Sequence, residues 1–387
     1  MNNEKFKETK ISRRHAISKV AAVGGIVAAG VITGLGGYLA GSNQNAQPPQ
    51  TATTTITQAI TRTLTQPVTT TVEVTPRLTP VDVNLVTTSG ARNAAFFLLP
   101  IDDARGRELA SRLGLNIRSY RQVRGTGEAI TDVLERRADI ILAASIDASL
   151  QAMERGVDIR FIHFNDRFAI STFIGRKGFP HKTLDQMRDA VRRGERIRVG
   201  YTRPGGLSYF NMLFLAAQLG TKEGEGVIGL SLGEQDAILA AMARNEVDLY
   251  GTTLGFALQT QERGIADIIL KESTVRGALW HSWTLLTNTE TIERRPELVA
   301  RVVAYTRELI KLCEVDRDYA VSLMMKEPPA GYGYSKAVAE SYYDEMLWNH
   351  LGAPNASALS KMRDEYTAWG LIRSVPPLAN WYTTRFL

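Results

Sequence analysis

The segment 202–208, Thr-Arg-Pro-Gly-Gly-Leu-Ser, combines residue types that can recognise a polar ligand. Its glycines let backbone N–H groups come close to a ligand, and a helix beginning behind them would add partial positive charge at its N-terminus. Arg203 can pair with an oxyanion, and Ser208 can cap the helix or donate to the ligand. These features favour an anionic or electron-rich ligand group over a cation. The alternative is an ordinary strand-to-helix turn in which Ser208 only caps the helix and Arg203 points to solvent.

Other polar side chains follow predicted strands, where open α/β sheets bind their ligands. Ser145 and the pair Thr252-Thr253 each come directly after an apolar run. Trp280 or Trp283 could stack on a ligand, although both could equally be packed aromatics. The candidate ligand-binding residues are Ser89, Arg92, Asn93, Ser145, Arg203, Gly205, Gly206, Ser208, Tyr209, Thr252, Thr253 and Trp280.

The sequence carries no recognisable catalytic or metal-binding motif. Cys313 is the single cysteine and lies in an apolar helical context, which rules out a disulfide within the chain and a zinc cluster. The pair Gly125 and Gly127 lacks the third glycine of a dinucleotide site, and no Gly-Lys-Ser/Thr follows the glycines of segment 202–208. The histidines lack metal-ligand spacing and no Gly-x-Ser-x-Gly elbow occurs. We therefore predict no catalytic residue, no metal and no cofactor, and a protein that is not an enzyme.

The positive charge of the chain is concentrated at its start. Residues 1–19 contain six Lys/Arg and two Asp/Glu, and so carry +4 of the net charge of +6. A nucleic-acid-binding protein would concentrate its basic residues on the folded part. We therefore expect no nucleic-acid partner.

The basic region contains a candidate export signal. Arg13-Arg14 after Ser12, followed by an apolar run, resembles the core of a twin-arginine signal, although Ala16 stands where Phe is common. The alternative is the ordinary positive flank of a membrane anchor. Either way we expect residues 1–19 to stay cytoplasmic as a basic n-region.

Residues 20–40 contain no charged residue, and a helix of this length spans roughly 30 Å, enough to cross a bilayer core. We interpret them as a transmembrane anchor or a signal h-region, and small residues around Ala40 leave cleavage open. Residues 41–80 are rich in Thr, Gln and Pro and predict a flexible linker. The expected location is the cell membrane, with the C-terminal bulk outside the cytoplasm.

From residue 81 strands and helices alternate. The patterns predict a strand at 81–86, a mainly helical stretch at 94–113 interrupted at Pro100, a strand at 116–120, a helix at 130–137 and a buried strand at 140–143. This order indicates an α/β protein with mainly parallel sheets.

A faint internal repeat supports two similarly built halves. Ile130 begins an amphipathic helix, and Asp139 opens the strand that follows it. Ile238 and Asp248 stand in the same relation further along the chain. The likeness predicts two similar lobes, with chance similarity as the alternative.

Four stretches carry a family resemblance. They are Ala138–Ser145, Arg198–Ser208, Ile238–Asp248 and Thr287–Ile310, the last with Arg295-Pro296-Glu297 inside it. Their order and spacing resemble the nitrate/sulfonate/taurine and thiamine-pyrimidine family of ABC-importer solute-binding proteins.

The resemblance implies the two-lobed type II periplasmic-binding-protein fold. Lobe 1 would hold about 81–170 and 281–387, lobe 2 about 171–280, with two connecting strands as a hinge. Ligand would sit between the lobes, and the partners would be an ABC permease and its ATPase, with a monomeric body tethered to the membrane by the N-terminal helix. Nitrate, a sulfonate such as taurine and a pyrimidine-type thiamine precursor are all open as ligands, because Leu254-Gly255 replaces the acidic-Pro pair usual in the family.

Two other functions fit the same fold. One is an enzyme resembling the pyrimidine-synthesising relatives, although their cysteine-rich iron motif has no counterpart in a chain with one Cys. The other is a ligand-sensing ectodomain, which we disfavour because no signalling region follows Leu387.

Overall fold

The structure is a computed structural model, which describes residues 54–56, 70–72, 78–88, 94–167, 169–276 and 280–387. The chain divides into two compact units, Met1–Pro76 and Arg77–Leu387. The predicted regions 1–19 and 20–40 lie outside the described residues. Among the residues that are described, no helix is long and apolar enough to span a membrane.

The described residues of the first unit form a short strand pair inside the segment predicted as a flexible linker. Strand β1 (Thr54–Ile56) pairs antiparallel with β2 (Thr70–Val72). Both strands consist of Thr, Ile and Val, the β-branched residues that favour extended backbone.

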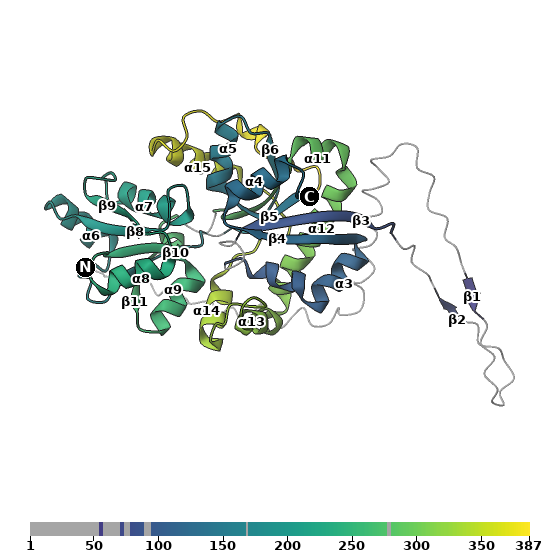
Figure 1. Cartoon of the computed structure of the whole chain (residues 1–387), viewed down its shortest axis with the longest axis horizontal. Helices are drawn as coiled ribbons and strands as arrows, with labels where there is room; N and C mark the ends of the chain where they lie inside the picture. The colour runs from purple at the N-terminus through teal and green to yellow at the C-terminus, as the bar shows by residue number, and fades with distance from the viewer. Residues whose placement is uncertain (1–53, 57–69, 73–77, 89–93, 168, 277–279) are drawn as a thin grey trace, which may run out of the picture. The chain divides into compact units, whose positions relative to one another are not determined.

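The second unit is built on two five-stranded sheets. The first sheet defines lobe 1 and has the order β4 (Leu115–Val123), β3 (Val81–Thr88), β5 (Ile140–Ser145), β12 (Trp283–Asn288) and β6 (Ile159–Phe164). The second defines lobe 2 and has the order β11 (Ala266–Lys271), β7 (Ser171–Arg176), β10 (Leu249–Thr253), β8 (Ile197–Tyr201) and β9 (Val227–Ser231). The chain passes from lobe 1 to lobe 2 between β6 and β7 and returns between β11 and β12 (Figure 1).

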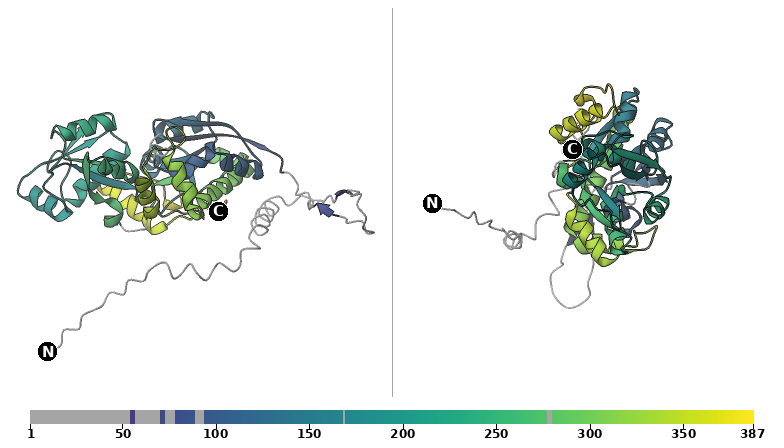
Figure 2. Two further views of the ribbon diagram at one scale, coloured as in Figure 1. Left: turned by 90° about the horizontal axis from the view of Figure 1, so that it is seen from below. Right: turned by 90° about the vertical axis from the view of Figure 1, so that its left-hand side faces the viewer.

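Helices complete both lobes, as two further views show (Figure 2). Lobe 1 contains the 3-10 helices η2 (Phe96–Asp102) and η3 (Leu378–Asn380) and the helices α3 (Ala104–Arg112), α4 (Thr126–Leu134), α5 (Ile146–Glu154), α11 (Thr289–Arg294), α12 (Pro296–Val315), α13 (Arg317–Met325), α14 (Lys336–Glu345) and α15 (Ala356–Ala368). Lobe 2 contains α6 (Leu184–Arg192), α7 (Leu207–Gln218), α8 (Gln235–Ala243), α9 (Leu254–Glu262) and α10 (Glu272–Arg276).

Both faces of each sheet are covered, because neighbouring residues of one strand enter different cores. In β3, Leu85 packs with α12 in one core, whereas Val86 packs with α4 and α5 in another. In β7, Phe173 joins the core with α7 and Ile174 the core with α8. Alternation along a strand sends successive side chains to opposite faces, so each lobe has three layers.

The sheets are more mixed than the sequence predicted. In lobe 1, β3 pairs parallel with β4 and β5, whereas β12 pairs antiparallel with β5 and β6. In lobe 2, β8 pairs parallel with β9 and β10, whereas β7 pairs antiparallel with β10 and β11. The antiparallel pairings all involve β7 or β12, the first strand after each crossing. The alternation of strands and helices could not reveal that β7 and β12 run antiparallel to their neighbours. Each of them follows a segment of the other lobe, and not a helix that packs on its own sheet.

The internal repeat corresponds to one structural device used in both lobes. In lobe 1, the Asp139 carboxylate precedes β5 and accepts a 2.7 Å bond from the backbone N–H of Asn84 in β3. In lobe 2, Asp248 precedes β10 and accepts a 3.0 Å bond from the backbone N–H of Arg198 in β8. Each carboxylate also pairs with an arginine side chain, Arg295 in lobe 1 and Arg198 in lobe 2. The two lobes therefore attach their helix-to-strand turns in the same way.

Two predicted helices have different limits in the structure. The stretch 94–113 is divided into η2 and α3, because Asp103 caps α3 by accepting a bond from the Arg105 N–H. The helix predicted at 130–137 is α4, which ends at Leu134, and Arg136 beyond it has φ of 60°. That left-handed residue turns the chain toward β5.

Candidate ligand site between the two lobes

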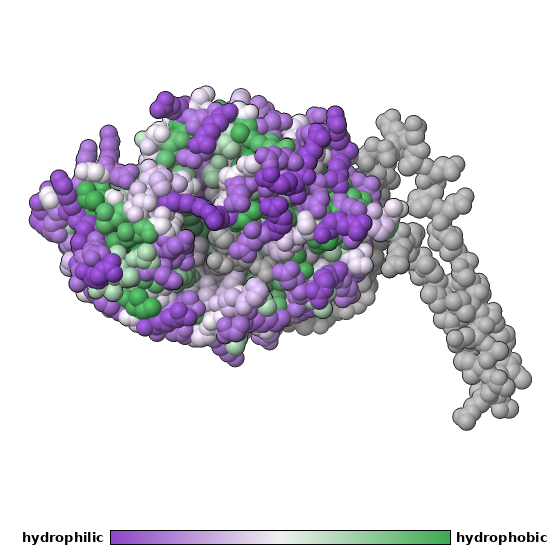
Figure 3. Space-filling view, viewed as in Figure 1, coloured by the Kyte–Doolittle hydropathy of each residue, from purple (hydrophilic) through white to green (hydrophobic). Residues whose placement is uncertain are grey.

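The two lobes enclose a hollow that is visible on the face of Figure 3. Two cavities among the described residues have walls from both lobes. The first lies where the chain crosses between the sheets, and we call it the hinge cavity. Its lining residues are Ser145, Asp147, Ile170, Ser171, Leu207, Phe210, Asn211, Glu272, Trp280, His281, Ser282, Trp283, Tyr366 and Trp369. Its enclosed space is about 30 Å³, and about 450 Å³ when the space open to solvent is counted.

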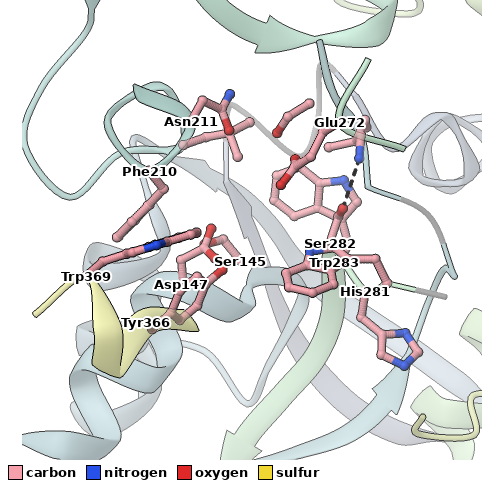
Figure 4. A pocket seen from close by; sticks show the side chains of 14 residues that line it. Ser145, Asp147, Phe210, Asn211, Glu272, His281, Ser282, Trp283, Tyr366 and Trp369 are labelled. Carbon is pink, nitrogen blue, oxygen red and sulfur yellow. Dashed lines mark hydrogen bonds between the residues drawn. The ribbon is translucent and has the colours of Figure 1, made fainter. Parts of the chain in front are cut away.

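The hinge cavity is acidic and aromatic. Asp147 and Tyr366 lie together, with the tyrosine O–H donating to the carboxylate, and Glu272 faces them from lobe 2 (Figure 4). Only 6% of Glu272 is exposed. No described lining residue is Lys or Arg. Two carboxylates in such a wall disfavour a negatively charged ligand.

His281 adds no positive charge to this wall. Burial lowers its pKa to about 4, although a hydrogen bond to the Asp166 carbonyl works in the opposite direction. Its Nδ1–H donates to the Asp166 carbonyl oxygen at 2.5 Å, and its Nε2 accepts the Asn355 backbone N–H at 3.0 Å. The ring is therefore neutral and both of its nitrogens have hydrogen-bond partners. In Figure 4 it points away from the cavity.

The crossings behind the cavity are tied to each other. The Asp166 carboxylate accepts the backbone N–H groups of Ser282 at 2.7 Å and Trp283 at 3.1 Å. The Ser282 hydroxyl in turn accepts the backbone N–H of Ile170 at 3.3 Å. These bonds hold the two connections side by side, which suits a hinge that bends as one unit.

Within the part of the chain that the structure describes, two buried N–H groups of hinge-cavity residues have no hydrogen-bond partner. They are the amide nitrogen of Asn211, on α7 of lobe 2, and the indole nitrogen of Trp283, at the start of β12 in lobe 1. Each residue is 3% exposed. Buried donors are rarely left unpaired in proteins, and a space of about 30 Å³ can hold a water that accepts from them.

The second cavity has a volume of about 380 Å³, and the described residues that line it are uncharged. We call it the amide cavity, because three glutamine side chains line it. Its residues are Gln122, Gln235, Thr253, Phe256, Gln259, Pro328, Pro329, Gly331, Tyr332 and Tyr334. Gln122 comes from β4 of lobe 1, four residues come from the α8 and β10–α9 region of lobe 2, and the rest come from the loop between α13 and α14.

Direct contacts hold the lobes together beside these cavities. Arg203 Nη2 of lobe 2 donates a 2.8 Å bond to the carbonyl oxygen of Arg124, just before α4 of lobe 1. Lys271 at the end of β11 pairs with Glu345 at the end of α14. Gly255 of α9 packs so closely on Tyr334 that an added Cβ would lie 2.5 Å from the tyrosine oxygen. The structure therefore shows the lobes in contact.

The residues predicted for the site are distributed over different places. Ser145 and Trp280 line the hinge cavity, and Thr253 lines the amide cavity. Thr252 is buried next to Thr253 and lines neither cavity. Ser89, Arg92 and Asn93 lie outside the described residues.

The glycine-rich loop 202–208 forms hydrogen bonds of its own, and its part in ligand binding remains a prediction. The Ser208 hydroxyl accepts the Thr202 N–H at 3.0 Å, and thus closes the loop on itself. Gly206 is the N-cap of α7, and Gly205, with φ of +73°, lies across the cleft from Gln151. Tyr209 meets Tyr201 edge to face inside lobe 2, with ring centroids 5.2 Å apart. None of these residues lines either cavity.

Sequence reasoning missed most of the cavity walls. Asp147 lies in the first turn of α5 and Asn211 in the second turn of α7, beyond the loops that we considered. Glu272 and Gln259 had no comparable signal, because their side chains reach the cleft only through the packing of α9 and α10.

No protein-family model matches the chain, and no curated protein matches it. Solved structures do match. The alkanesulfonate-binding protein SsuA from Xanthomonas axonopodis pv. citri, bound to MOPS, is 14% identical with a TM-score of 0.62, over 79% of this chain and 99% of that one. The periplasmic nitrate-binding protein NrtA from Synechocystis PCC 6803 is 10% identical with a TM-score of 0.59, over 76% and 83%.

A third match is the Candida albicans CA3427 gene product, described as having the generic periplasmic binding protein fold. It is 14% identical with a TM-score of 0.62, over 79% of this chain and 96% of that one. These likenesses define the class: the second unit has the periplasmic-binding-protein fold, in agreement with the resemblance drawn from the sequence. At such low identity they show the fold alone.

Proposed function

We propose that the chain is the extracytoplasmic solute-binding component of an ABC importer. The observation that carries this proposal is the pair of cavities whose walls come from both lobes, next to two crossings that can act as a hinge. A ligand that contacts both lobes stabilises the closed arrangement over the open one, which a membrane partner can then recognise. The fold shared with sulfonate- and nitrate-binding proteins supports the same function.

Small-angle scattering tests the proposal directly. The full chain should become more compact when a true solute saturates it, and the same solute should raise the melting temperature. Nitrate, taurine and an aminopyrimidine are the first solutes to try, because they represent the ligand classes of the family that the sequence resembles. A solute that raises the melting temperature without compaction would argue against capture by hinge closure.

The membrane context is part of the proposal. Residues 20–40 would anchor the chain with residues 1–19 in the cytoplasm, and an ABC permease with its ATPase would receive the solute. Pull-down of the closed, ligand-loaded chain with permease subunits from the same membrane would test the partnership. Equal capture of ligand-free and ligand-loaded chain would contradict it.

An enzyme on this fold is the alternative. The desulfurization enzyme DSZB is 13% identical with a TM-score of 0.55 over 79% of this chain, so the fold admits chemistry. Burial raises the pKa of the Cys313 thiol far above its ordinary value, and this residue lines neither cavity. It therefore offers no nucleophile to the cleft. Product formation from a solute that binds the purified chain would favour the enzyme.

A further inference from the structure

The amide cavity, not the hinge cavity, has the space that a small organic molecule needs. Its volume of about 380 Å³ compares with about 30 Å³ of enclosed space in the hinge cavity. Ligand pockets in proteins typically measure roughly 300–1,000 Å³. A solute held in the closed arrangement therefore fits the amide cavity without further opening of the lobes.

The lining selects against ions. None of the ten described lining residues carries a charge, although 22% of the chain is Asp, Glu, Lys or Arg. An ion moved from water into such a wall would lose hydration without gaining an opposite charge. The neutral amides of the glutamines instead offer hydrogen-bond donors and acceptors. They suit ligand groups that can both donate and accept a hydrogen bond. Hydroxyl groups have that property.

Aromatic rings provide the apolar part of the wall. Phe256 comes from α9, and Tyr332 and Tyr334 come from the loop between α13 and α14, with their ring centroids 5.1 Å apart. Flat aromatic faces cover the C–H surface of a saturated ring well, and a tyrosine adds a hydroxyl at the edge. The combination of amides and aromatic faces fits a ring that is apolar on its faces and hydroxylated around its rim.

The loop that supplies the tyrosines is held in place by hydrogen bonds within the chain. The backbone N–H groups of Tyr332 and Gly333 donate to the carbonyls of Met324 at 3.0 Å and Lys326 at 2.8 Å. A Cβ on Gly331 would lie 2.2 Å from the Leu323 carbonyl oxygen, so this loop can pack only with glycine there. A preformed wall of this kind reduces the entropy that binding has to overcome.

We propose that the amide cavity binds an uncharged, hydroxyl-rich ring compound, a monosaccharide or disaccharide. The ring lies against Phe256 and the two tyrosines, and its hydroxyls bond to Gln122 of lobe 1 and to Gln235 and Gln259 of lobe 2. The bonds to both lobes favour closure. This inference rests on the proposed function and names its ligand class. It differs from the sulfonate and nitrate bound by the structural neighbours.

Calorimetry on the full chain tests the ligand class, with glucose, maltose and trehalose as neutral probes and taurine and nitrate as anionic ones. Gln259→Leu should weaken saccharide binding at least tenfold. Gln261→Leu is the matched control, because Gln261 is exposed on the same helix and does not line the cavity. Circular dichroism of both variants shows whether they fold alike.

The possible outcomes separate the two proposals. Saccharide binding that is lost in Gln259→Leu and kept in Gln261→Leu supports the inference. Binding and compaction with taurine or nitrate alone would overturn the ligand class and leave the solute-binding function intact. Saccharide binding that Gln259→Leu leaves unchanged would overturn the assigned cavity. Absence of both binding and compaction with every probe would count against the inference and the proposed function together.

Discussion

Arg203 and Arg124 join the two lobes across the cleft, with the guanidinium Nη2 of Arg203 2.8 Å from the carbonyl oxygen of Arg124. Arg124 directly precedes Gly125, the N-cap of α4. An added Cβ on Gly125 would lie 2.7 Å from the same Nη2. The contact therefore depends on an arginine in one lobe and a glycine in the other, and it can form only when the lobes are close.

Loss of this contact should disfavour the closed arrangement. We expect Arg203→Ala to weaken solute binding about threefold to tenfold, or ~0.7–1.4 kcal/mol, because closure then lacks one charged hydrogen bond. Isothermal titration measures the affinity, and Arg192→Ala, an exposed arginine on α6, is the control. The expectation from the sequence that Arg203 binds an anion remains a prediction. A loss well beyond tenfold that is specific to anionic solutes would favour it.

A second substitution tests the same contact from the opposite lobe. Gly125→Ala should displace the Arg203 side chain and weaken binding to a similar degree. Gly127→Ala should have little effect, because nothing lies within 4 Å of a Cβ at that position. The double variant with Arg203→Ala should be no weaker than either single variant. Additive losses would mean that the two residues act independently.

The sequence revealed the lobes better than it revealed the site between them. Asp139 and Asp248 open equivalent strands, and this repeat is visible because it is local in the chain. The amide cavity, in contrast, combines Gln122, Gln235 and Tyr332, residues that lie far apart in the sequence and follow no shared period. The neighbouring sequence also does not determine where a long side chain points. The sequence places Arg203 on a loop, but only the approach of lobe 1 gives its guanidinium the Arg124 carbonyl as a partner.

Export should depend on the paired arginines at the start of the chain. Replacement of Arg13 and Arg14 together by Lys keeps the positive charge but removes the twin-arginine pattern. We expect the double variant to accumulate inside the cell, as measured by protease accessibility of intact cells. Normal surface display of this variant would instead indicate that the basic region only orients a membrane anchor.

Asp248 should stabilise lobe 2 above its own pKa. Burial raises the pKa of this carboxyl, but hydrogen bonds from Arg198 and Arg176 outweigh burial and hold it below 3.8. Its side chain is 8% exposed. Asp248→Asn removes the carboxylate that both arginines bond and should cost about 2–4 kcal/mol at neutral pH.

The contribution of Asp248 to stability should depend on pH. A depressed pKa in the folded state stabilises the fold above pH 3.8 and loses that contribution as the pH falls through the folded value. The difference between Asp248→Asn and the wild type in urea unfolding should therefore shrink in strong acid. Asp189→Asn is the control, because Asp189 is 60% exposed in its pair with Arg192. An equal difference at neutral and acid pH would show that the charge of Asp248 is not responsible.

Two buried histidines should make the fold less stable in mild acid. Burial lowers the pKa of His163 and of His281 to about 4, against 6.5 for an exposed imidazole. The unfolded chain therefore binds protons between pH 6.5 and 4 that the folded chain does not. The contribution of the neutral histidines to the free energy of unfolding is fully present above pH 6.5. Below that pH it falls by up to ~1.4 kcal/mol per pH unit for each histidine, until the folded state is protonated as well.

His281→Asn removes one of these groups, so the slope of unfolding free energy against pH should decrease by about one proton. Urea titrations at several pH values measure that slope, and it is independent of any uniform loss of stability caused by the substitution. A slope equal to that of the wild type would show that His281 is already protonated in the fold, contrary to its bonds with Asp166 and Asn355.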